Sequence, residues 1–540
     1  MLAQALRSQG VDTMFYLMGG PMLETEAACI KLGIRAIDHR HEQAAALAAH
    51  AWTRLTRRPG VCMGCSGPGA TNLLTGIANA FTDAAPVLAI GGSSPRVFLG
   101  MEAFQEIDQV AVFRPVTKWA ERIYDARRIP DMVQTALRQA TTGRPGPVYL
   151  DLPGDVLGEK IEEESVVYPP AWRPAPRCLG DPAAIKDAIA LLGKAERPVV
   201  IAGSGVWWSD GAAAFQSFVE ATGIPFYTTP ISRGLIPEDH NLAFLNARSK
   251  AFTEADVVLA VGTRFNWVIQ FGRPPRFSAD LKVIHVDINP TQLGHNRDVD
   301  VPIAGDARAV LEQLRAEAQG KIDPKRYAAW TGKLRVLDAE KSAEQDKAMS
   351  SDATPIHPLR LCKEVRDFLR RDAILVVDGQ EILNFGRQAI PTFTPGHRLN
   401  SGAFGCMGVG LPFGVGAKVA EPNTQVVVLH GDGSFGINAM DIDTAVRHNI
   451  PVIVVISNNG GWTANAPWTR PLPKPGRNLG HTRYDKLAQD LGAHGEFVEK
   501  PHDIRPALER AYASGKPAVV NVITDDKARA QTVRFSAYTT

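Results

Sequence analysis

The chain has few cysteines for its length, with six among 540 residues. So few thiols do not suggest a framework of disulfides. Cys62 and Cys65 form a C-x-x-C pair, but a zinc site needs a second pair of ligands at suitable spacing, and the sequence has none. The segment HRHEQ lacks the second histidine of a zinc-protease motif, because Ala46 stands in its place. We therefore expect the two cysteines to lie in a buried strand and the turn after it.

The chain also lacks a long apolar run and an excess of charge. No stretch reaches the roughly 20 apolar residues of a membrane-spanning helix, and no basic segment followed by an apolar run opens the sequence. The net charge is +2 at pH 7, which gives no electrostatic reason to bind nucleic acid or a membrane surface. We expect a cytoplasmic protein that binds neither.

Two polar segments divide the chain into three blocks. YPPAWRPAPR (168–177) is rich in proline and is typical of a linker, and the span from about 320 to 356 is polar and charged. The blocks are 1–165, 178–325 and 356–540. Each alternates short apolar runs with amphipathic helical patterns, as parallel sheets covered by helices do. The sequence predicts an α/β protein with three doubly wound parallel-sheet domains.

One stretch of the third block, GDGSFGINAMDIDTAVRHNIPVIVVISNN (431–459), combines a glycine turn with oxygen-bearing side chains. Its apolar runs predict two strands with a helix between them, and Asp432 and Asn459 follow the carboxyl ends of those strands. Ligands of open parallel sheets bind at such ends. An Asp, an Asn and free carbonyls are hard ligands that suit magnesium and leave positions for a phosphate. The alternative is that Asp432 caps a helix and the asparagines form a turn.

Two features of the first block would be ordinary if they stood alone. Glu42 follows a short apolar segment and begins an alanine-rich helical pattern, where a carboxylate interacts favourably with the helix dipole. The glycine turn of SGPGATN (66–72) opens a second helical pattern and would let a ligand approach the backbone.

Taken together, these motifs are far more specific. Glu42, SGPGATN, AFQEIDQ, GCMGVGLPFGVGA and the GDG–NN pair occur in this order along the chain. In this combination the sequence resembles the thiamine diphosphate-dependent enzymes of the acetolactate synthase and oxalyl-CoA decarboxylase superfamily, over essentially its whole length. The resemblance implies a pyrimidine-binding domain at 1–165, a central nucleotide-binding-like domain at 178–325 and a diphosphate-binding domain at 356–540.

The resemblance also implies a site for thiamine diphosphate and Mg²⁺. It assigns the metal to Asp432, Asn459 and the carbonyl of Gly461. It makes Met407 the apolar wedge that bends the cofactor. The implied cofactor-binding residues are Gln380, Gly405, Met407, Gly433, Ser434 and Phe435.

For catalysis, the resemblance implies that the carboxyl group of Glu42 exchanges a proton with the aminopyrimidine ring. Gln105, within AFQE, is the second catalytic candidate. The family places the glutamate on one subunit and the diphosphate on another. We therefore expect a homodimer or homotetramer with active sites at the subunit interface.

The substrate class depends on a balance of resemblances. AFQE and DINP (287–290) are similar to acetolactate synthases, which act on pyruvate. TRFNW (263–267), HTRYDKLAQDLG (481–492) and ARAQTVRF (528–535) resemble oxalyl-CoA decarboxylases and 2-hydroxyacyl-CoA lyases. Phe104 and Trp462 stand where oxalyl-CoA decarboxylases carry tyrosine, and these differences argue against oxalyl-CoA.

We therefore predict cleavage of a 2-hydroxyacyl-CoA to formyl-CoA and an aldehyde or ketone, with the reverse condensation also catalysed. An acetolactate synthase-type carboligase is the first alternative and an oxalyl-CoA decarboxylase the second. The predicted substrate pocket contains Gly20, Phe104 and Trp462. Arg398 is a candidate for the CoA phosphates on position alone.

In the central block, Asp287 ends the apolar run KVIHVDI, where a carboxylate can bind ribose hydroxyls. The resemblance implies bound ADP there, with FAD as the acetolactate synthase alternative. Arg264 could contact the nucleotide phosphates or form a structural salt bridge. The tail at 528–535 could fold over the active site as a lid or remain a solvated terminus.

Overall fold

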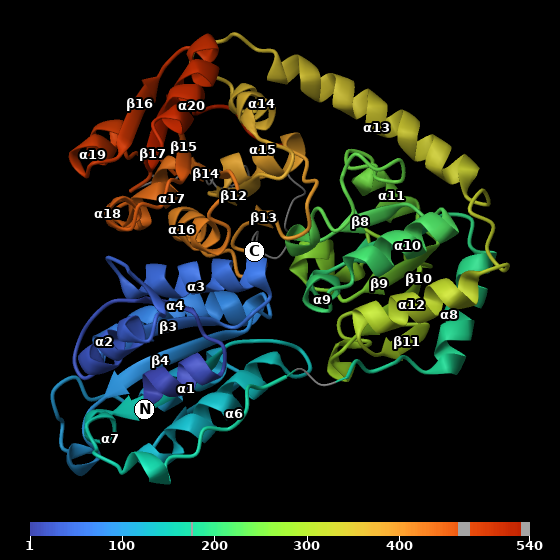
Figure 1. Cartoon of the computed structure of the whole chain (residues 1–540). Coiled ribbons are helices and arrows are strands. Elements are labelled where there is room, and N and C mark those ends of the chain that lie inside the picture. The colour runs from blue at the N-terminus through green and yellow to red at the C-terminus, as the bar shows by residue number, and fades with distance from the viewer. Residues whose placement is uncertain (174–175, 463–475, 531–540) are drawn as a thin grey trace.

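The computed structural model describes residues 1–173, 176–462 and 476–530. Figure 1 shows three α/β units. In each unit the strands of one sheet pair in parallel. The prediction of an α/β protein with three parallel sheets is confirmed. Many of the strands are continuous apolar runs, as strands buried on both faces must be.

The N-terminal sheet has six strands in the order β2-β1-β3-β4-β6-β5. The strands are β1 (Thr13–Tyr16), β2 (Arg35–Asp38), β3 (Gly60–Gly64), β4 (Val87–Ser93), β5 (Trp119–Arg122) and β6 (Val148–Pro153). The helices are α1 (Leu2–Ser8), α2 (Leu23–Lys31), α3 (Glu42–Thr56), α4 (Pro68–Thr82), α5 (Gln109–Phe113), α6 (Ile129–Thr141) and α7 (Gly154–Leu157). Helices α3 and α4 contribute to one hydrophobic core and α1 and α6 to another, so the sheet is covered on both faces.

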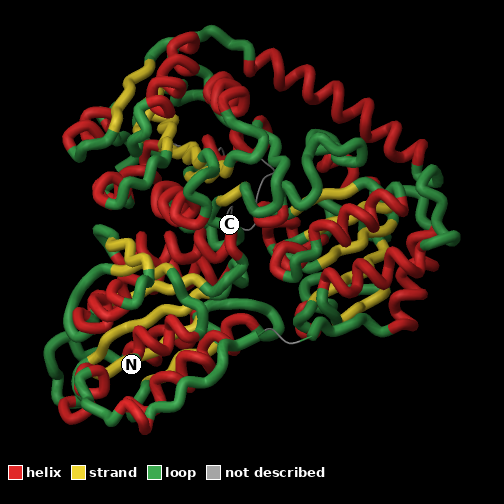
Figure 2. The backbone as a smooth tube through the Cα atoms, viewed as in Figure 1, coloured by secondary structure: helices red, strands yellow, loops and turns green. Residues whose placement is uncertain are grey.

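The central sheet has five strands in the order β11-β10-β9-β7-β8. They are β7 (Pro198–Ala202), β8 (Phe226–Thr228), β9 (Val257–Val261), β10 (Lys282–Asp287) and β11 (Val301–Ala304). Its helices are α8 (Pro182–Lys194), α9 (Ser204–Trp208), α10 (Ala212–Thr222), α11 (Arg248–Glu254) and α12 (Ala307–Ala318). The long α13 (Ala328–Met349) then leads to the third unit along the outside of the molecule (Figures 1 and 2).

The C-terminal sheet has six strands in the order β13-β12-β14-β15-β17-β16. They are β12 (Ile374–Asp378), β13 (Arg398–Leu399), β14 (Val426–Gly431), β15 (Ile453–Asn458), β16 (His494–Val498) and β17 (Ala518–Ile523). Its helices are α14 (Pro358–Phe368), α15 (Glu381–Ala389), α16 (Gly410–Ala420), α17 (Asp432–Ile437), α18 (Asp441–Arg447), α19 (Tyr484–Asp490) and α20 (Ile504–Ala513).

The N-terminal and C-terminal units share one hydrophobic core where α3 packs against α16 (Figure 1). The helix backbones approach so closely that a Cβ at Gly416 would lie 2.2 Å from the carbonyl oxygen of Ala48. The central unit joins this contact through Trp207, whose indole N–H donates to the carbonyl of Arg54 at 2.8 Å. Within the described residues, no helix has the length and apolar character needed to cross a membrane.

Candidate functional site

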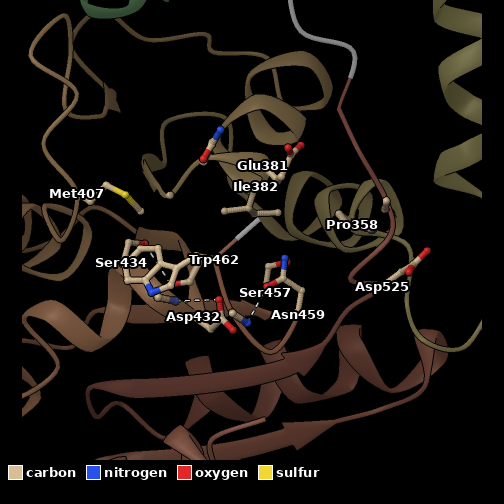
Figure 3. A pocket seen from close by; sticks show the side chains of 16 residues that line it. Pro358, Glu381, Ile382, Met407, Asp432, Ser434, Ser457, Asn459, Trp462 and Asp525 are labelled. Atoms are coloured by element: carbon tan, nitrogen blue, oxygen red, sulfur yellow. Dashed lines mark hydrogen bonds between the residues drawn. The ribbon is translucent and has the colours of Figure 1, made fainter. Parts of the chain in front are cut away.

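Two predicted metal-binding side chains lie at adjacent strand ends of the C-terminal sheet. Strands β14 and β15 pair in parallel, with Gly431 opposite Ser457, so the residues that follow them lie side by side. Asp432 and Asn459 line one cavity there, and Figure 3 shows their side chains close together. Asn458 has a different role: it is fully buried, and its side-chain amide donates to the carbonyl of Thr482 and to Asn521 Oδ1, both at 3.0 Å.

Only one of the two carboxylate oxygens of Asp432 has a hydrogen-bond partner among the described residues. Oδ1 accepts a hydrogen bond from the backbone N–H of Gly433 at 2.8 Å, whereas Oδ2 is buried without a hydrogen-bond partner in the described part of the chain. Burial raises the pKa of Asp432 to about 6. An unpartnered buried carboxylate oxygen is costly unless a ligand satisfies it. The residues present therefore fit a bound cation, which would favour the ionised carboxylate.

The same cavity gathers most of the other residues predicted to bind the cofactor or the metal. Its wall contains Gln380, Met407, Asp432, Gly433, Ser434, Asn459, Gly461 and Trp462. Gly433 and Gly461 leave room that a side chain would fill. A Cβ at Gly433 would lie 2.8 Å from the Trp462 ring, and one at Gly461 would lie 2.1 Å from the carbonyl oxygen of Arg477.

Two predicted cofactor residues are not on this wall. Phe435 is buried behind it, with its ring edge-on to those of His430 and Tyr484. Gly405 precedes Met407 in a left-handed conformation with φ of +73°, and a Cβ there would meet no neighbour within 4 Å. Their contacts with a cofactor remain predictions.

The wall also contains residues that the sequence did not single out, among them Glu381, Ser457 and Asp525 (Figure 3). Glu381 begins α15 directly after the predicted Gln380, and its Oε2 accepts from the backbone N–H of Ala530 at 3.0 Å. The chain after β17 therefore passes beside the cavity. The predicted lid at 528–535 lies mostly outside the described residues, so its closure stays a prediction.

The second group of predicted residues lies at the carboxyl ends of the N-terminal sheet. Glu42 begins α3 and is 4% exposed, and its Oε2 accepts from Asn72 Nδ2 at 2.9 Å. Ser66 joins two further candidates, because its hydroxyl approaches Gln105 Oε1 at 2.5 Å and the carbonyl oxygen of Gly20 at 3.4 Å. These contacts place Gly20 and Gln105 together beside the SGPG turn.

Phe104 is 86% exposed on the loop after β4. No residue of the N-terminal sheet is among the described residues that line the cavity at Asp432. Within one chain, the predicted proton-transfer residue and the predicted metal ligands thus belong to separate surfaces.

The cysteine pair has no metal-site geometry. Cys62 is buried within β3 and Cys65 lies in the turn that follows. Within the described residues, no group of three or more His, Cys, Asp or Glu side chains could hold a metal ion.

In the central unit, a cavity lies where the three units meet. Its wall includes Asp83 of the first unit, Arg264 of the second and Gly402 of the third. One guanidinium N–H of Arg264 donates to the carbonyl of Thr82 at 2.5 Å. Asp287 accepts from the backbone N–H of Asn289 at 2.8 Å, and burial raises the pKa of this carboxyl, with the charges of Arg144 and Arg264 opposing that rise.

The prediction that Arg398 contacts CoA has to be corrected. Arg398 is 2% exposed in β13, and its guanidinium donates to the carbonyls of Gly386 at 2.9 Å and Ile390 at 3.3 Å. The side chain holds α15 and the segment after it in place, and it does not reach the surface where CoA phosphates could bind.

A set of arginines that the sequence reasoning missed lies near Arg398 where the central and C-terminal units meet, and there a guanidinium N–H of Arg233 donates to the carbonyl of Arg387 at 3.0 Å. It comprises Arg233, Arg248, Arg276 and Arg387, called here the arginine cluster. Burial first, and then the charges of Arg276, Arg387 and Arg233, lower the pKa of Arg248 to about 9, whereas the Tyr227 hydroxyl opposes this shift. The four residues are far apart in sequence, so no local motif could have revealed them.

Comparison with known proteins identifies the class. Residues 1–112 match the N-terminal TPP binding domain of thiamine pyrophosphate enzymes, residues 185–314 their central domain, and residues 383–522 their C-terminal TPP binding domain. The chain belongs to the thiamine diphosphate-dependent enzymes, which confirms the family predicted from its motifs.

Individual relatives align over almost the whole chain. The chain is 38% identical to the acetolactate synthase large subunit IlvG of Mycobacterium tuberculosis, over 97% of this chain and 95% of that protein. It is 34% identical to the 2-hydroxyacyl-CoA lyase of Arabidopsis thaliana, over 99% and 96% respectively. It is also 34% identical to the oxalyl-CoA decarboxylase of Escherichia coli, over 98% and 95%. The protein is thus a thiamine diphosphate-dependent enzyme of the lyase, decarboxylase or carboligase type.

Proposed function

We propose that this enzyme is a carbon–carbon lyase that cleaves a 2-hydroxyacyl-CoA to formyl-CoA and an aldehyde or ketone. The reverse condensation uses the same site. The observation that carries the proposal is the arginine cluster, since an acyl-CoA is a large polyanion and pyruvate is not.

The arginine cluster has unused capacity to bind anions. Arg233 is paired with Glu238. Arg248, Arg276 and Arg387 form no ion pair with any described carboxylate, and they contact Phe252, Ser249 and Asn384 instead. Three guanidinium groups that remain charged at neutral pH and lie together are an unfavourable arrangement without an anion. Arginine also binds phosphates through paired N–H donors. The CoA phosphates provide suitable anions.

The arginine cluster is also placed at a suitable distance from the cofactor cavity. Helix α15 begins at Glu381, on the cavity wall, and carries Arg387 six residues later. At about 1.5 Å per residue this separation is roughly 9 Å along the helix axis. An elongated substrate could bind its phosphates at the arginines while its reacting end enters the cavity.

For the cofactor, we propose that Asp432, Asn459 and the Gly461 carbonyl hold Mg²⁺ and that Ser434, Gly433 and Gln380 contact the diphosphate. The remaining predicted contacts are Met407, Gly405 and Phe435. When bound, thiamine diphosphate supplies the electron sink for breaking the carbon–carbon bond. Glu42 then moves a proton: Asn72 holds Oε2, while Oε1 faces the backbone of Gly69 at the mouth of the turn.

A second copy of the chain would complete the site. The Glu42 surface and the Asp432 cavity are separate within one chain, and apolar side chains are exposed on the loop after β4. Val97, Met101 and Phe104 are 71%, 68% and 86% exposed. Large exposed apolar residues beside an incomplete active site are expected to be buried against a second copy of the chain. We therefore propose a homodimer or homotetramer with the active site at the subunit interface.

The central unit is proposed to hold a nucleotide. The cavity beside Arg264, together with Arg144 and the buried Asp287, offers cations for phosphates and a carboxylate for ribose. ADP is the proposed ligand and FAD the alternative. Denatured protein would release the nucleotide, and FAD would be visible by its yellow colour.

An acetolactate synthase remains the second candidate, because the identity to relatives with that name is higher, at 38% against 34%. Oxalyl-CoA decarboxylation is third. The deciding experiment incubates the enzyme with thiamine diphosphate, Mg²⁺ and, separately, several 2-hydroxyacyl-CoAs, oxalyl-CoA and pyruvate, and identifies the products. Formation of formyl-CoA together with an aldehyde or ketone from a 2-hydroxyacyl-CoA supports the proposal, whereas formyl-CoA from oxalyl-CoA alone would favour the third candidate. Acetolactate from pyruvate without cleavage of any 2-hydroxyacyl-CoA would overturn it.

A further inference from the structure

A chain of buried polar contacts leads from the edge strand β5 to the SGPG turn of the N-terminal unit. Asp151 on β6 is fully buried, and its Oδ2 accepts from Arg122 Nε and from Ser93 Oγ. Its Oδ1 accepts from Gln109 Nε2 at 2.7 Å. Gln109, at the start of α5, in turn accepts from the backbone N–H of Gly67 with its Oε1, also at 2.7 Å.

The side-chain amide of Gln109 fits this position in one orientation. The Gly67 N–H can only donate, and the Asp151 carboxylate, held by Arg122, accepts. The amide oxygen must therefore face Gly67 and the amide nitrogen must face Asp151. Gln109 is 1% exposed, so water cannot replace either contact without a rearrangement. A glutamate of the same shape has no donor for Asp151.

The turn held by Gln109 touches both predicted catalytic side chains. Gly67 has a left-handed φ of +55°, and a Cβ there would lie 2.5 Å from the carbonyl oxygen of Gln105. Ser66 bonds the side chain of Gln105. Two residues later, a Cβ at Gly69 would lie 3.2 Å from Glu42 Oε1. A shift of this turn would move Gln105 and change the surroundings of Glu42 together.

We infer that Gln109, anchored by Asp151 and Arg122, is a positioning residue that sets the SGPG turn for proton transfer by Glu42 and for the action of Gln105. The inference rests on the roles proposed above for those two residues. Gln109 itself does not touch the substrate or the cofactor.

The first test is Gln109→Glu. At pH 8 the new carboxylate would face Asp151, and the repulsion should displace the turn. A misplacement of about 1 Å can cost about 10²-fold in rate, so we expect kcat to fall by roughly that factor, with little change in KM for the acyl-CoA. Lowering the pH should restore activity as the two carboxyl groups share a proton. The charged or titratable groups that face this position are Asp151, Arg122 and Tyr149.

Gln425→Glu provides the matched control. Gln425 is 5% exposed and its Oε1 accepts from the backbone N–H of Arg370 at 2.8 Å, in the C-terminal unit away from the turn. This variant also buries a new carboxyl group. Gln425→Glu should leave the pH profile of kcat as in the wild type. A profile that changes only in Gln109→Glu then reports displacement of the turn and not general destabilisation.

The second test exchanges the hydrogen-bond donor and acceptor between the side chains of Gln109 and Asp151 and asks whether activity is restored. In Gln109→Glu/Asp151→Asn the carboxylate accepts from Gly67 and from the new amide, while the amide oxygen accepts from Arg122 and Ser93. We expect kcat to recover at least about tenfold relative to the single variant. The Gly67, Arg122 and Ser93 donors have acceptors again, and the Gly92 carbonyl loses the N–H that Gln109 donates to it at 2.9 Å. Hydrogen exchange of the Gly67 amide, measured on protein without cofactor, should accelerate in the single variant and slow again in the double variant.

The inference is wrong if Gln109→Glu keeps both the wild-type pH profile and the wild-type exchange rate at Gly67, or if the folded double variant is no better than the single one. Amide exchange needs no substrate. If the exchange rate at Gly67 responds as expected but the wild type cleaves no 2-hydroxyacyl-CoA, the role of Gln109 in positioning the turn is supported and only the proposed reaction is wrong.

Discussion

The N-terminal and C-terminal sheets have the same strand order but carry different chemistry at their carboxyl ends. Numbered within each unit, both read 2-1-3-4-6-5. In the N-terminal sheet, β2 leads to Glu42 and β3 to the SGPG turn. In the C-terminal sheet, β14, the third strand, leads to Asp432 and β15 to Asn459. We propose that the same topology presents an acid for proton transfer in one unit and oxygen ligands for a cation in the other.

The difference teaches that strand order fixes where a site can form, and that a few side chains fix what it does. Glu42 is held by Asn72, whereas Asp432 Oδ2 is buried and has no partner in the part of the chain that the structure describes. We therefore propose that Glu42 acts on a proton and that the Asp432 carboxylate is stabilised in its ionised form by a bound cation. The two sites can be tested against each other.

The largest effect is expected from Asp432→Ala, which removes the carboxylate that makes the C-terminal site differ. Magnesium-dependent binding of thiamine diphosphate should weaken by at least about 10²-fold, more than the loss of a residue that only supports a ligand. Isothermal titration calorimetry with and without Mg²⁺ measures this. Asp443→Ala, on α18 outside the cavity, is the control. Unchanged affinity in the Asp432 variant would mean that the aspartate only caps α17.

Glu42→Gln tests the other site. The protein should fold and bind the cofactor, because glutamine keeps the size of the side chain, but turnover should drop by about 10²–10⁴-fold with loss of proton transfer. Steady-state kinetics and cofactor titration give the two quantities. A rate within a factor of two of the wild type would reduce Glu42 to an ordinary helix-start residue.

Two helices extend the comparison, because each follows the first strand of its sheet: α2 in the N-terminal unit and α15 in the C-terminal unit. Helix α15 carries Arg387 of the arginine cluster, and Arg387→Met should raise the KM for a 2-hydroxyacyl-CoA by about tenfold, as expected for a lost hydrogen bond to a charged group. The salt dependence of KM should also become weaker. Arg505→Met, an exposed arginine of α20 paired with Glu509, is the control. If both variants behave alike, the arginine cluster does not bind the substrate.

Helix α2, which follows β1, carries Glu26, and the smallest effect is expected there. Burial raises the pKa of Glu26 from 4.5 to about 7. The folded state therefore holds this proton more tightly than the unfolded state, so its contribution to stability is present below about pH 4.5 and is lost as the pH rises to about 7. Glu26→Gln should raise Tm at pH 8 by about 1–3 °C and leave it unchanged at pH 4.5. Thermal unfolding at both pH values, with the exposed Glu24→Gln as control, measures this; equal shifts at both pH values would contradict it.

Much of the fold could be predicted from local pattern. Runs such as QVVVLHGDG and PVIVVISNN are apolar because strands covered on both faces exclude water, and glycine turns at their ends mark the edge where ligands bind. The residues near Asp432 that are proposed to bind the cofactor were predicted from a family resemblance carried by short motifs, and the structure brings most of them to one wall.

The contacts proposed for the substrate were not predictable in this way. Arg398 and Arg387 are both arginines close to the same segments. Arg398 donates to backbone carbonyls inside the core, whereas Arg387 belongs to the arginine cluster and forms no ion pair with a described carboxylate. Sequence position does not distinguish them, because the distinction depends on which carbonyls and side chains each guanidinium reaches in the folded chain.

By itself the sequence determined the family, the three parallel sheets and the residue types at the strand ends, since each of these depends on short-range spacing and on burial of apolar runs. Only the tertiary structure decided which polar atoms remain without partners, such as Asp432 Oδ2, and which are joined over long distances, such as Asp151, Gln109 and Gly67. The physical reason is that hydrogen bonds and charges act over a few ångströms in space, and the packing of the sheets decides which distant residues come that close.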